Sequence, residues 1–287
     1  MPILTASRVS IVAGKGGVGK TTVTAVLARA AADAGYRVLV VELDGKSVLA
    51  ELAGDVPCEE ISASDALEEY LRAHGFGRFA KRLSSSGVID VVATAAPGID
   101  DIVVLGKIKQ LERSGKWDVI VVDGPAAGHA ITFLLAASAL RDAVRSGPVR
   151  TQADEVLAML SDPSRAQVVL VTLPETTPVN EVVETAAALE DRVGVKLGAV
   201  VVNGVDDQAA GEQPPDPRTL TLPPGRDGDL LTRAADYRRS RRRMQDEEIE
   251  RLAGALAVER WQLPLLPVAG LTAEHVEVLA GALRSSP

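Results

Sequence analysis

The sequence of 287 residues is poor in cysteine and in aromatic residues. Cys58 is its only cysteine, which excludes an intramolecular disulfide and a zinc site built from several cysteines. There are three Phe, three Tyr and two Trp, so Ala, Val and Leu must fill the core. With 46% hydrophobic and 24% charged residues, the composition is that of a folded globular protein.

Long apolar runs are also missing. No run reaches the roughly 18 residues that a membrane-spanning helix requires. Residues 1–7 lack the charged start and apolar centre of a signal peptide. We therefore expect a cytoplasmic protein with no stable membrane insertion.

The chain lacks an excess of positive charge. Its net charge is −8 and its isoelectric point is near 5.1, which opposes non-specific binding to nucleic acid. One basic cluster spans 238–243, but acidic residues follow it at 246–250. Mixed charge of this kind is typical of a solvated helix, so no nucleic-acid partner is expected.

Short β-branched runs alternate with longer Ala- and Leu-rich segments, as in a parallel sheet covered by helices. We expect a single α/β domain over residues 1–287, with a mostly parallel, doubly wound sheet. Nearly all-apolar strands of this kind are buried on both faces. The predicted strands are Arg8–Ala13, Arg37–Leu43, Gly87–Ala93, Lys116–Val122, Gln167–Thr172, Lys196–Val202 and Arg260–Leu263.

Helical spacing predicts helices over Thr21–Ala34 and Val179–Arg192, each closed by a glycine. Two further stretches, about 50–86 and 134–165, have helical spacing with no clear strand and predict an inserted α-helical subdomain. Residues of about 206–232 are rich in Pro, Gly and Asp and predict a flexible loop.

A phosphate-binding loop follows the first predicted strand. Gly14-Lys15-Gly16-Gly17-Val18-Gly19-Lys20-Thr21 fits G-x-x-x-x-G-K-T and precedes a predicted helix, as the mechanism requires. The glycines let backbone N–H groups face phosphate oxygens, and the helix N-terminus adds partial positive charge. Lys20 is expected to reach the β- and γ-phosphates and Thr21 to coordinate Mg²⁺. The loop predicts binding of ATP with Mg²⁺.

Two acidic residues end predicted strands, where open α/β sheets bind ligands. Asp123 has the position of the carboxylate that holds Mg²⁺ through water. The run from Gly124 to His129 is suited to sensing a γ-phosphate. Asp44 is interpreted as the residue that orients the attacking water, with a helix cap as the alternative.

Asn203 follows the predicted strand Lys196–Val202. Its amide can donate to and accept from an adenine edge. A turn residue is the equal alternative.

Several motifs in one order resemble the family that contains the bacterial arsenite-pump ATPase and the eukaryotic ATPase that targets tail-anchored membrane proteins. The first is the loop through Thr22, GKGGVGKTT, which has the extra lysine of the deviant Walker A class. The others are Pro97-Gly98-Ile99-Asp100-Asp101, Asp123–His129 (DGPAAGH), Val202-Asn203, Arg242-Arg243-Met244-Gln245 and Pro264-Leu265-Leu266-Pro267.

The resemblance implies a dimeric ATPase. By it, Lys15 acts across the dimer interface like an arginine finger, although a solvent-facing lysine is the alternative. Asp44 positions the hydrolytic water and Asp123 serves magnesium. Glu175 is implied to touch nucleotide and Asn203 the adenine, and Pro267 and Val268 belong to a loop over the base.

The chain departs from the family pattern in its switch segments. The first switch reads Asp44-Gly45-Lys46-Ser47 instead of D-P-A-H, and the second lacks the family's threonines. The cysteines that bind zinc or arsenite in the family are missing, so neither site is expected. Only three Met are present, which disfavours a Met-rich groove for membrane segments.

Three functions stay open on the sequence. The first is a dimeric Mg-ATPase that captures or releases a protein client, whose identity is unknown. The second is a weakly hydrolysing, nucleotide-sensing subunit paired with a paralogue, so the dimer can be a homodimer or a heterodimer. The third is a partition or division-site ATPase.

Overall fold

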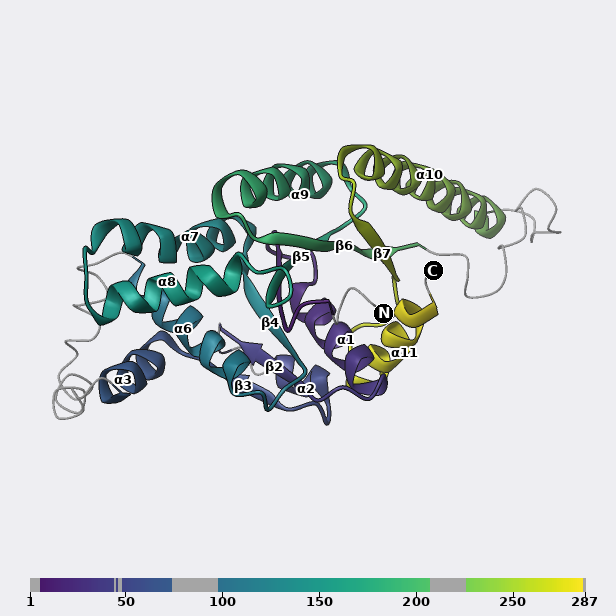
Figure 1. The fold of residues 1–287 in the computed structure, drawn as a ribbon. Helices are drawn as coiled ribbons and strands as arrows, with labels where there is room; N and C mark the ends of the chain where they lie inside the picture. The colour runs from purple at the N-terminus through teal and green to yellow at the C-terminus, as the bar shows by residue number, and fades with distance from the viewer. Residues whose placement is uncertain (1–5, 44, 46–47, 74–97, 207–225, 286–287) are drawn as a thin grey trace.

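The computed structural model describes residues 6–43, 45, 48–73, 98–206 and 226–285. Its centre is a sheet of seven parallel strands in the order β3-β2-β4-β1-β5-β6-β7 (Figure 1). The strands are β1 (Val9–Gly14), β2 (Val38–Glu42), β3 (Cys58–Glu60), β4 (Val119–Ala126), β5 (Ala166–Thr172), β6 (Lys196–Val205) and β7 (Glu259–Pro264). This confirms the predicted α/β class.

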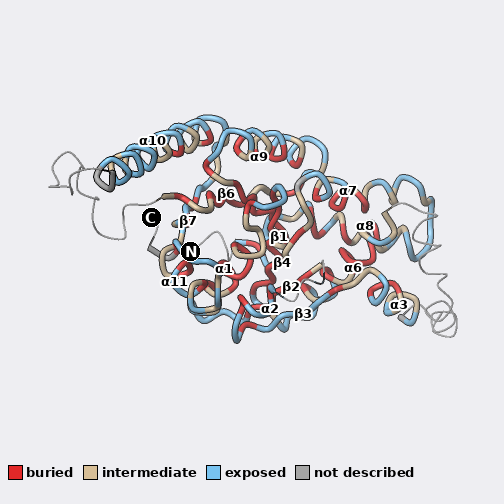
Figure 2. Tube along the Cα trace, turned by 180° about the vertical axis from the view of Figure 1, so that it is seen from behind, coloured by how far each residue is buried: buried red, intermediate tan, exposed pale blue. Residues whose placement is uncertain are grey.

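Alternate residues of the strands enter two separate hydrophobic cores, one on each face of the sheet. In β1, for example, Ile11 packs on one face and Val12 on the other, both fully buried. Burial on both faces explains why these strands read as continuous apolar runs. Figure 2 shows the buried residues concentrated along the strands and on the sides of the helices that face them.

One face of the sheet is covered by α1 (Lys20–Asp33), α2 (Val48–Ala53) and α11 (Ala273–Ser285). The other face packs against the remaining helices. These are α3 (Ala63–Ala73), α6 (Ile99–Arg113), α7 (Ala127–Ala143), α8 (Pro148–Leu160), α9 (Thr176–Ala188) with its π-helical end η1 (Leu189–Val193), and α10 (Arg226–Ala255). The sheet therefore has helices on both sides, as a doubly wound fold requires.

Six of the seven predicted strands begin and end within four residues of an observed one. The seventh, Gly87–Ala93, falls outside the described residues. The edge strand β3 has only three residues and was not predicted from the sequence, because so short a run carries no alternation to read.

The second predicted helical stretch, about 134–165, contains the C-terminal part of α7 and all of α8. Between them stands Gly147 with its φ of 99°, followed by Pro148 at the start of α8. That the stretch is an inserted subdomain stays a prediction. Both helices contribute buried residues to the core that also holds the sheet. Of the first stretch, α2, β3 and α3 are described. The predicted loop ends earlier than expected, because α10 already begins at Arg226.

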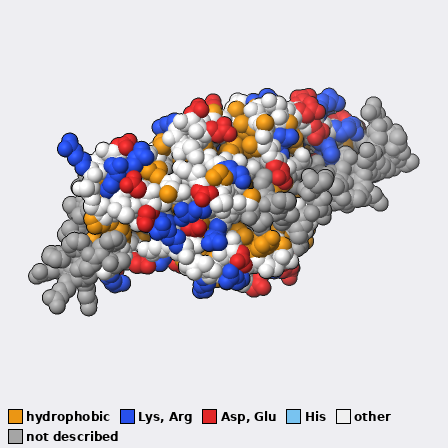
Figure 3. All heavy atoms as spheres, viewed as in Figure 1, with side chains coloured by type: hydrophobic (Ala, Val, Ile, Leu, Met, Phe, Trp, Pro, Cys, Tyr) orange, Lys and Arg blue, Asp and Glu red, His pale blue; other side chains and the backbone are white. Residues whose placement is uncertain are grey.

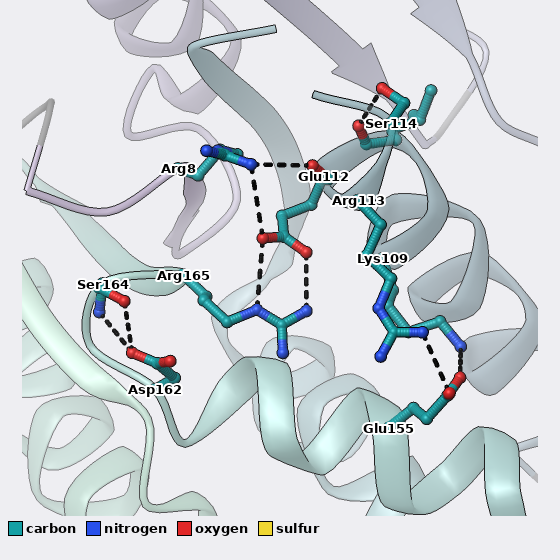
Figure 4. Close-up of polar contacts among 10 residues, drawn as sticks. Arg8, Lys109, Glu112, Arg113, Ser114, Glu155, Asp162, Ser164 and Arg165 are labelled. Carbon is teal, nitrogen blue, oxygen red and sulfur yellow. Dashed lines mark hydrogen bonds and ion pairs between the residues drawn. The ribbon is translucent and has the colours of Figure 1, made fainter. Parts of the chain in front are cut away.

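Polar contacts tie α6 to the sheet and to α8 (Figure 4). Glu112 of α6 is buried and accepts hydrogen bonds from Arg165, at 2.7 Å from Nη2 and 3.3 Å from Nε. Arg8, just before β1, donates to the Glu112 carbonyl at 3.2 Å. One turn earlier, the buried Lys109 contacts Glu155 at 2.5 Å and Gln152 at 2.7 Å on α8. These bonds lock α6 and α8 onto the sheet.

The exposed side chains are mixed in charge. On the face seen in Figure 3, basic and acidic side chains are interspersed. Arg238 in the predicted basic cluster pairs with Asp206 at 2.7 Å, and Arg239 pairs with Asp236 on its own helix. None of the helices in the described part of the chain has the length and apolar character needed to cross a bilayer.

Candidate nucleotide site

The loop between β1 and α1 has the shape of a phosphate cradle. Gly17 and Gly19 have φ values of 86° and 90°, a left-handed conformation that glycine adopts without strain. A Cβ on Gly14 would lie 2.4 Å from the carbonyl oxygen of Val171, so the loop needs glycine where it passes β5. Added Cβ atoms on Gly16 and Gly17 would meet no described atom within 4 Å, which leaves room beside the loop.

The helix N-terminus that follows is open to an anion. Its N-cap residue, Gly19, has no side chain to bond the first amides, and α1 has no acidic residue in its first turn. The first four N–H groups of a helix have no partner within the helix, and with the helix dipole they favour a bound anion. Thr21 and Thr22 stand half-buried in this turn.

Asp123 joins this loop through the threonines of α1. Its Oδ2 accepts a hydrogen bond from Thr21 Oγ1 at 2.8 Å, and its Oδ1 accepts one from Thr24 Oγ1 at 3.3 Å. Thr24 is fully buried, so this contact fixes the carboxylate from the core side. The predicted pair Thr21 and Asp123 is thus brought together, although it is separated by 102 residues.

Sheet topology explains the meeting. β4 lies beside β1, with Asp123 in register with Val12, so both strands deliver their carboxyl ends to the same edge. Asp123 follows Val122, which faces the opposite core, so its side chain lies on the α1 side. A Cβ on Gly124 would lie 2.5 Å from the carbonyl oxygen of Val12, which explains glycine after the aspartate.

Two site residues were missed by the sequence reading, Thr24 and Glu42. Glu42 is buried, 5% exposed, and stands in register with Asp123 on the neighbouring strand β2. Burial raises the pKa of the nearby Cys58 thiol, and the charges of Glu42, Asp123 and Glu60 raise it further. The spacing of Thr24, three residues after Thr21 on one helix face, is the signal that could have identified it.

Asn203 in β6 contacts the loop itself. Its Nδ2 donates a hydrogen bond to the carbonyl oxygen of Val18 at 2.9 Å. It also lies 2.2 Å from the place that a Cβ of Gly19 would take. The side chain therefore braces the loop, and its role as an adenine contact stays a prediction.

The two lysines of the loop lie against protein groups. Lys20 Nζ approaches the carbonyl oxygen of Lys15 at 3.3 Å. Lys15 forms an ion pair with Glu181 of α9, on its own chain. The role of Lys15 across a dimer interface stays a prediction.

Three other residues predicted to contact nucleotide follow the carboxyl ends of β5 and β7. Glu175 is exposed at the N-cap of α9. Pro267 and Val268 are exposed after β7, where the Leu265 amide donates to the Val205 carbonyl at 2.8 Å. Asp44 lies outside the described residues, as do Lys46 and Ser47 of the first switch. Nothing in the structure tests the nucleotide contacts predicted for these residues.

The second predicted switch, Asp123–His129, forms the end of β4 and the start of α7. Gly124, Pro125 and Ala126 end β4, and Gly128 and His129 lie in the first turn of α7. A cavity of about 190 Å³ is lined by Pro125 and His129 of this segment. Asp100 and Asp101 of α6, which belong to another of the family-like motifs, line the same cavity. Burial raises the pKa of Asp101, the Asp100 charge raises it further and His129 lowers it.

The residues fit ATP and Mg²⁺. The open glycines and the uncapped helix N-terminus suit a chain of phosphates. A threonine hydroxyl and a carboxylate 2.8 Å apart supply the oxygen donors that Mg²⁺ prefers. The loop, Thr21 and Asp123 together therefore offer the groups that bind a triphosphate and its Mg²⁺.

The chain is similar to known ATPases over the residues that form this site. The family model described as anion-transporting ATPase matches residues 7–147. The ATPase BagA of Mycobacterium tuberculosis is 32% identical over 225 residues, covering 70% of this chain and 66% of that protein. The arsenical pump-driving ATPase of Escherichia coli is 32% identical over 195 residues, covering 66% of this chain and 33% of the pump ATPase.

A third relative, a putative arsenical pump-driving ATPase of Halobacterium salinarum, is 29% identical over 222 residues, 34% of its length. The chain thus spans about two thirds of the mycobacterial relative and about one third of the pump-driving enzymes. The matched residues include the loop, Asp123 and the segment around Asp100. The chain belongs to the anion-transporting ATPase family, the ArsA family of P-loop ATPases.

Proposed function

We propose that the chain is a magnesium-dependent ATPase that works as a dimer and uses ATP to change shape and capture or release a protein client. The observation that carries the catalytic part is the hydrogen bond between Thr21 and Asp123 at the mouth of the glycine loop. Family membership supports the same activity. The cytoplasm is the proposed location.

Each residue has a defined part in this activity. Backbone amides from Gly14 to Thr22 bind the phosphates, and Lys20 neutralises charge at the β- and γ-phosphates. Thr21 and Asp123 hold Mg²⁺, which when bound offsets the charge that develops during phosphoryl transfer. Asp44 orients the attacking water. Asn203 keeps the loop in place through Val18.

The dimer enters the proposal through Lys15. It is exposed on the loop, where it pairs with Glu181 of its own chain. In the proposed dimer it contributes positive charge to the nucleotide of the partner, as an arginine finger does. The client is bound by the helical side, because the cavity at Asp101 and His129 joins α6 and α7 to the second switch.

The experiment is phosphate release by the purified chain with ATP and Mg²⁺, combined with sedimentation at several protein concentrations. The proposal predicts turnover that Lys20→Ala abolishes, and a mass that doubles with ATP. Turnover that survives Lys20→Ala would contradict it. A chain with Asp44→Asn is expected to bind ATP without turnover and to retain its client, so proteins that co-purify with it from cells identify that client.

Two observations favour a second function. Lys15 is engaged within its own chain by Glu181, and the second switch is built into β4 and α7. A subunit that senses nucleotide, hydrolyses it slowly and pairs with a paralogue fits this arrangement. Negligible turnover by the chain alone, restored on mixing with the paralogue, would favour this function over the first.

A further inference from the structure

Lys15 is held by a helix that is distant in the sequence. Its ammonium group forms an ion pair with Glu181 of α9, 166 residues away. The two side chains are 47% and 33% exposed. Thr185, one turn further along α9, donates its hydroxyl to the Glu181 carbonyl at 2.7 Å, within a helix whose Val182 and Ala186 are buried. The backbone at Glu181 is therefore fixed by the fold, and Lys15 reaches the Glu181 side chain from the loop.

The other half of the Glu181 carboxylate points into the protein. Its Oε2 is buried and has no hydrogen-bond partner among the described residues. A buried carboxylate oxygen without a donor is unfavourable. Lys15 is the cation that compensates this charge, so the contact has a defined partner and is more than a chance pairing of two surface side chains.

We propose that Glu181 is a positioning residue for Lys15 and competes with nucleotide phosphates for its ammonium group. This rests on the proposed function, because Lys15 matters to the reaction only if its loop binds ATP. The ammonium group cannot pair with Glu181 and with a phosphate at the same time. Glu181 thereby sets how readily Lys15 is available to a nucleotide, on its own chain or on a second copy.

The strength of the contact permits such an exchange. An ion pair between partly exposed side chains contributes less than a factor of ten to an equilibrium constant. A triphosphate brings several negative charges to the same loop and can therefore displace the carboxylate. A competing contact lowers the apparent affinity in proportion to the fraction of molecules in which Lys15 is free.

The first test measures the contact without nucleotide. The full chain is treated briefly with an acylating reagent, and modification of Lys15 is followed by mass spectrometry in wild type, Glu181→Gln and Glu184→Gln. Glu184 is exposed one turn along α9 and serves as the charge-matched control. Acylation of Lys15 is expected to rise about two- to fivefold in Glu181→Gln alone, in line with the strength of such a pair. Equal labelling of Lys15 in all three proteins would overturn the proposal.

The second test measures competition. Glu181→Gln is expected to lower the apparent dissociation constant for Mg-ATPγS about two- to fivefold, and Glu184→Gln to leave it unchanged. In a Lys15→Met background the Glu181 substitution should have no effect, which a purely structural role of Glu181 would not predict. An unchanged constant in Glu181→Gln, or the same gain without Lys15, would overturn the proposal.

These results are separable from the proposed function. If the gain in affinity depends on protein concentration, Lys15 acts on a second chain, and if not, on its own; either pattern supports competition. ATP that binds but is never hydrolysed would contradict the ATPase and leave the affinity test intact. Thermal midpoints of all variants show whether Glu181→Gln changes folding, and the labelling test does not depend on nucleotide binding.

Discussion

Asn203 lies so close to Gly19 that a side chain at position 19 would have to displace it. Its Nδ2 is 2.2 Å from the place of a Cβ on Gly19 and donates to the carbonyl oxygen of Val18 at 2.9 Å. Gly19 also has a φ of 90°. The closing turn of the loop is therefore set by one side chain from β6 and one glycine before α1.

Gly19→Ala is predicted to reduce nucleotide affinity at least tenfold. The new methyl group meets Asn203 and also costs about 1–2 kcal/mol for a left-handed backbone. Gly35→Ala is the matched control, because Gly35 has the same φ of 90° but no described atom within 4 Å of the added Cβ. Calorimetric titration with Mg-ATPγS checks affinity, and urea unfolding checks stability. Equal nucleotide affinity in the two variants would show that the clash with Asn203 has no effect.

Asn203→Ala separates two roles of that residue. If Asn203 mainly braces the loop, the variant loses affinity for ATP and GTP by similar factors, of about three- to tenfold for one hydrogen bond. If it also reads the adenine, the loss is greater for ATP. The bond to Val18 predicts at least the common loss. Unaltered binding of both nucleotides would contradict the bracing role.

The ion pair between Arg37 and Asp118 makes stability depend on pH. Hydrogen bonds from the Arg37 side chain and backbone lower the pKa of Asp118 from 3.8 to about 2. A carboxylate with a depressed pKa stabilises the fold above its unfolded pKa, and this contribution fades as pH falls from about 4 toward 2. The difference in unfolding free energy between wild type and Asp118→Asn should shrink between pH 5 and pH 3. In an Arg37→Gln background the pH-dependent part should become smaller, because only the backbone N–H of residue 37 still donates to Asp118. A constant difference between wild type and Asp118→Asn at all pH values would contradict the assignment.

Two lysines of α6 are predicted to differ in their contribution to stability. Lys109 is 4% exposed and supplies the donor for both Glu155 and Gln152. Lys109→Met removes the ammonium donor from the Glu155 carboxylate and the Gln152 amide oxygen, and it should destabilise the fold by about 1–3 kcal/mol. Lys107→Met, which breaks a more exposed pair with Glu69, should cost at most about 1 kcal/mol. Urea unfolding measures both, and equal losses would refute the role assigned to Lys109.

The sheet could be predicted because its strands carry their signal locally. Val38–Glu42 and Ala166–Thr172 are buried on both faces, and each contains an apolar run of four residues, at 38–41 and 168–171. The phosphate loop could also be predicted, because its motif consists of consecutive residues, Gly14 to Thr21. By contrast, β3 and α6 could not be placed: β3 is too short, and the buried side of α6 includes Lys109 and Glu112, polar residues that break its apolar spacing.

Long-range contacts account for what the sequence did not reveal at the site. Nothing in the sequence near Glu181 indicates a contact with Lys15, and nothing near Asn203 indicates that it braces Val18. Glu42 is hidden in an apolar strand, and only the register of β2 with β4 sets it beside Asp123. Asp123 itself was predictable because it follows an apolar strand that comes after a phosphate loop. In the fold it lies beside that loop and accepts a hydrogen bond from Thr21.

The central claim is tested most directly by the Mg²⁺ dependence of ATP turnover in Asp123→Asn. Asp142→Asn, which changes an exposed aspartate on α7, is the control. The account predicts that Asp123→Asn lowers turnover, or raises the Mg²⁺ concentration needed for it, by about 10- to 100-fold, as loss of a residue that holds a metal through water does. Turnover and Mg²⁺ dependence equal to those of the wild type and of Asp142→Asn would contradict it.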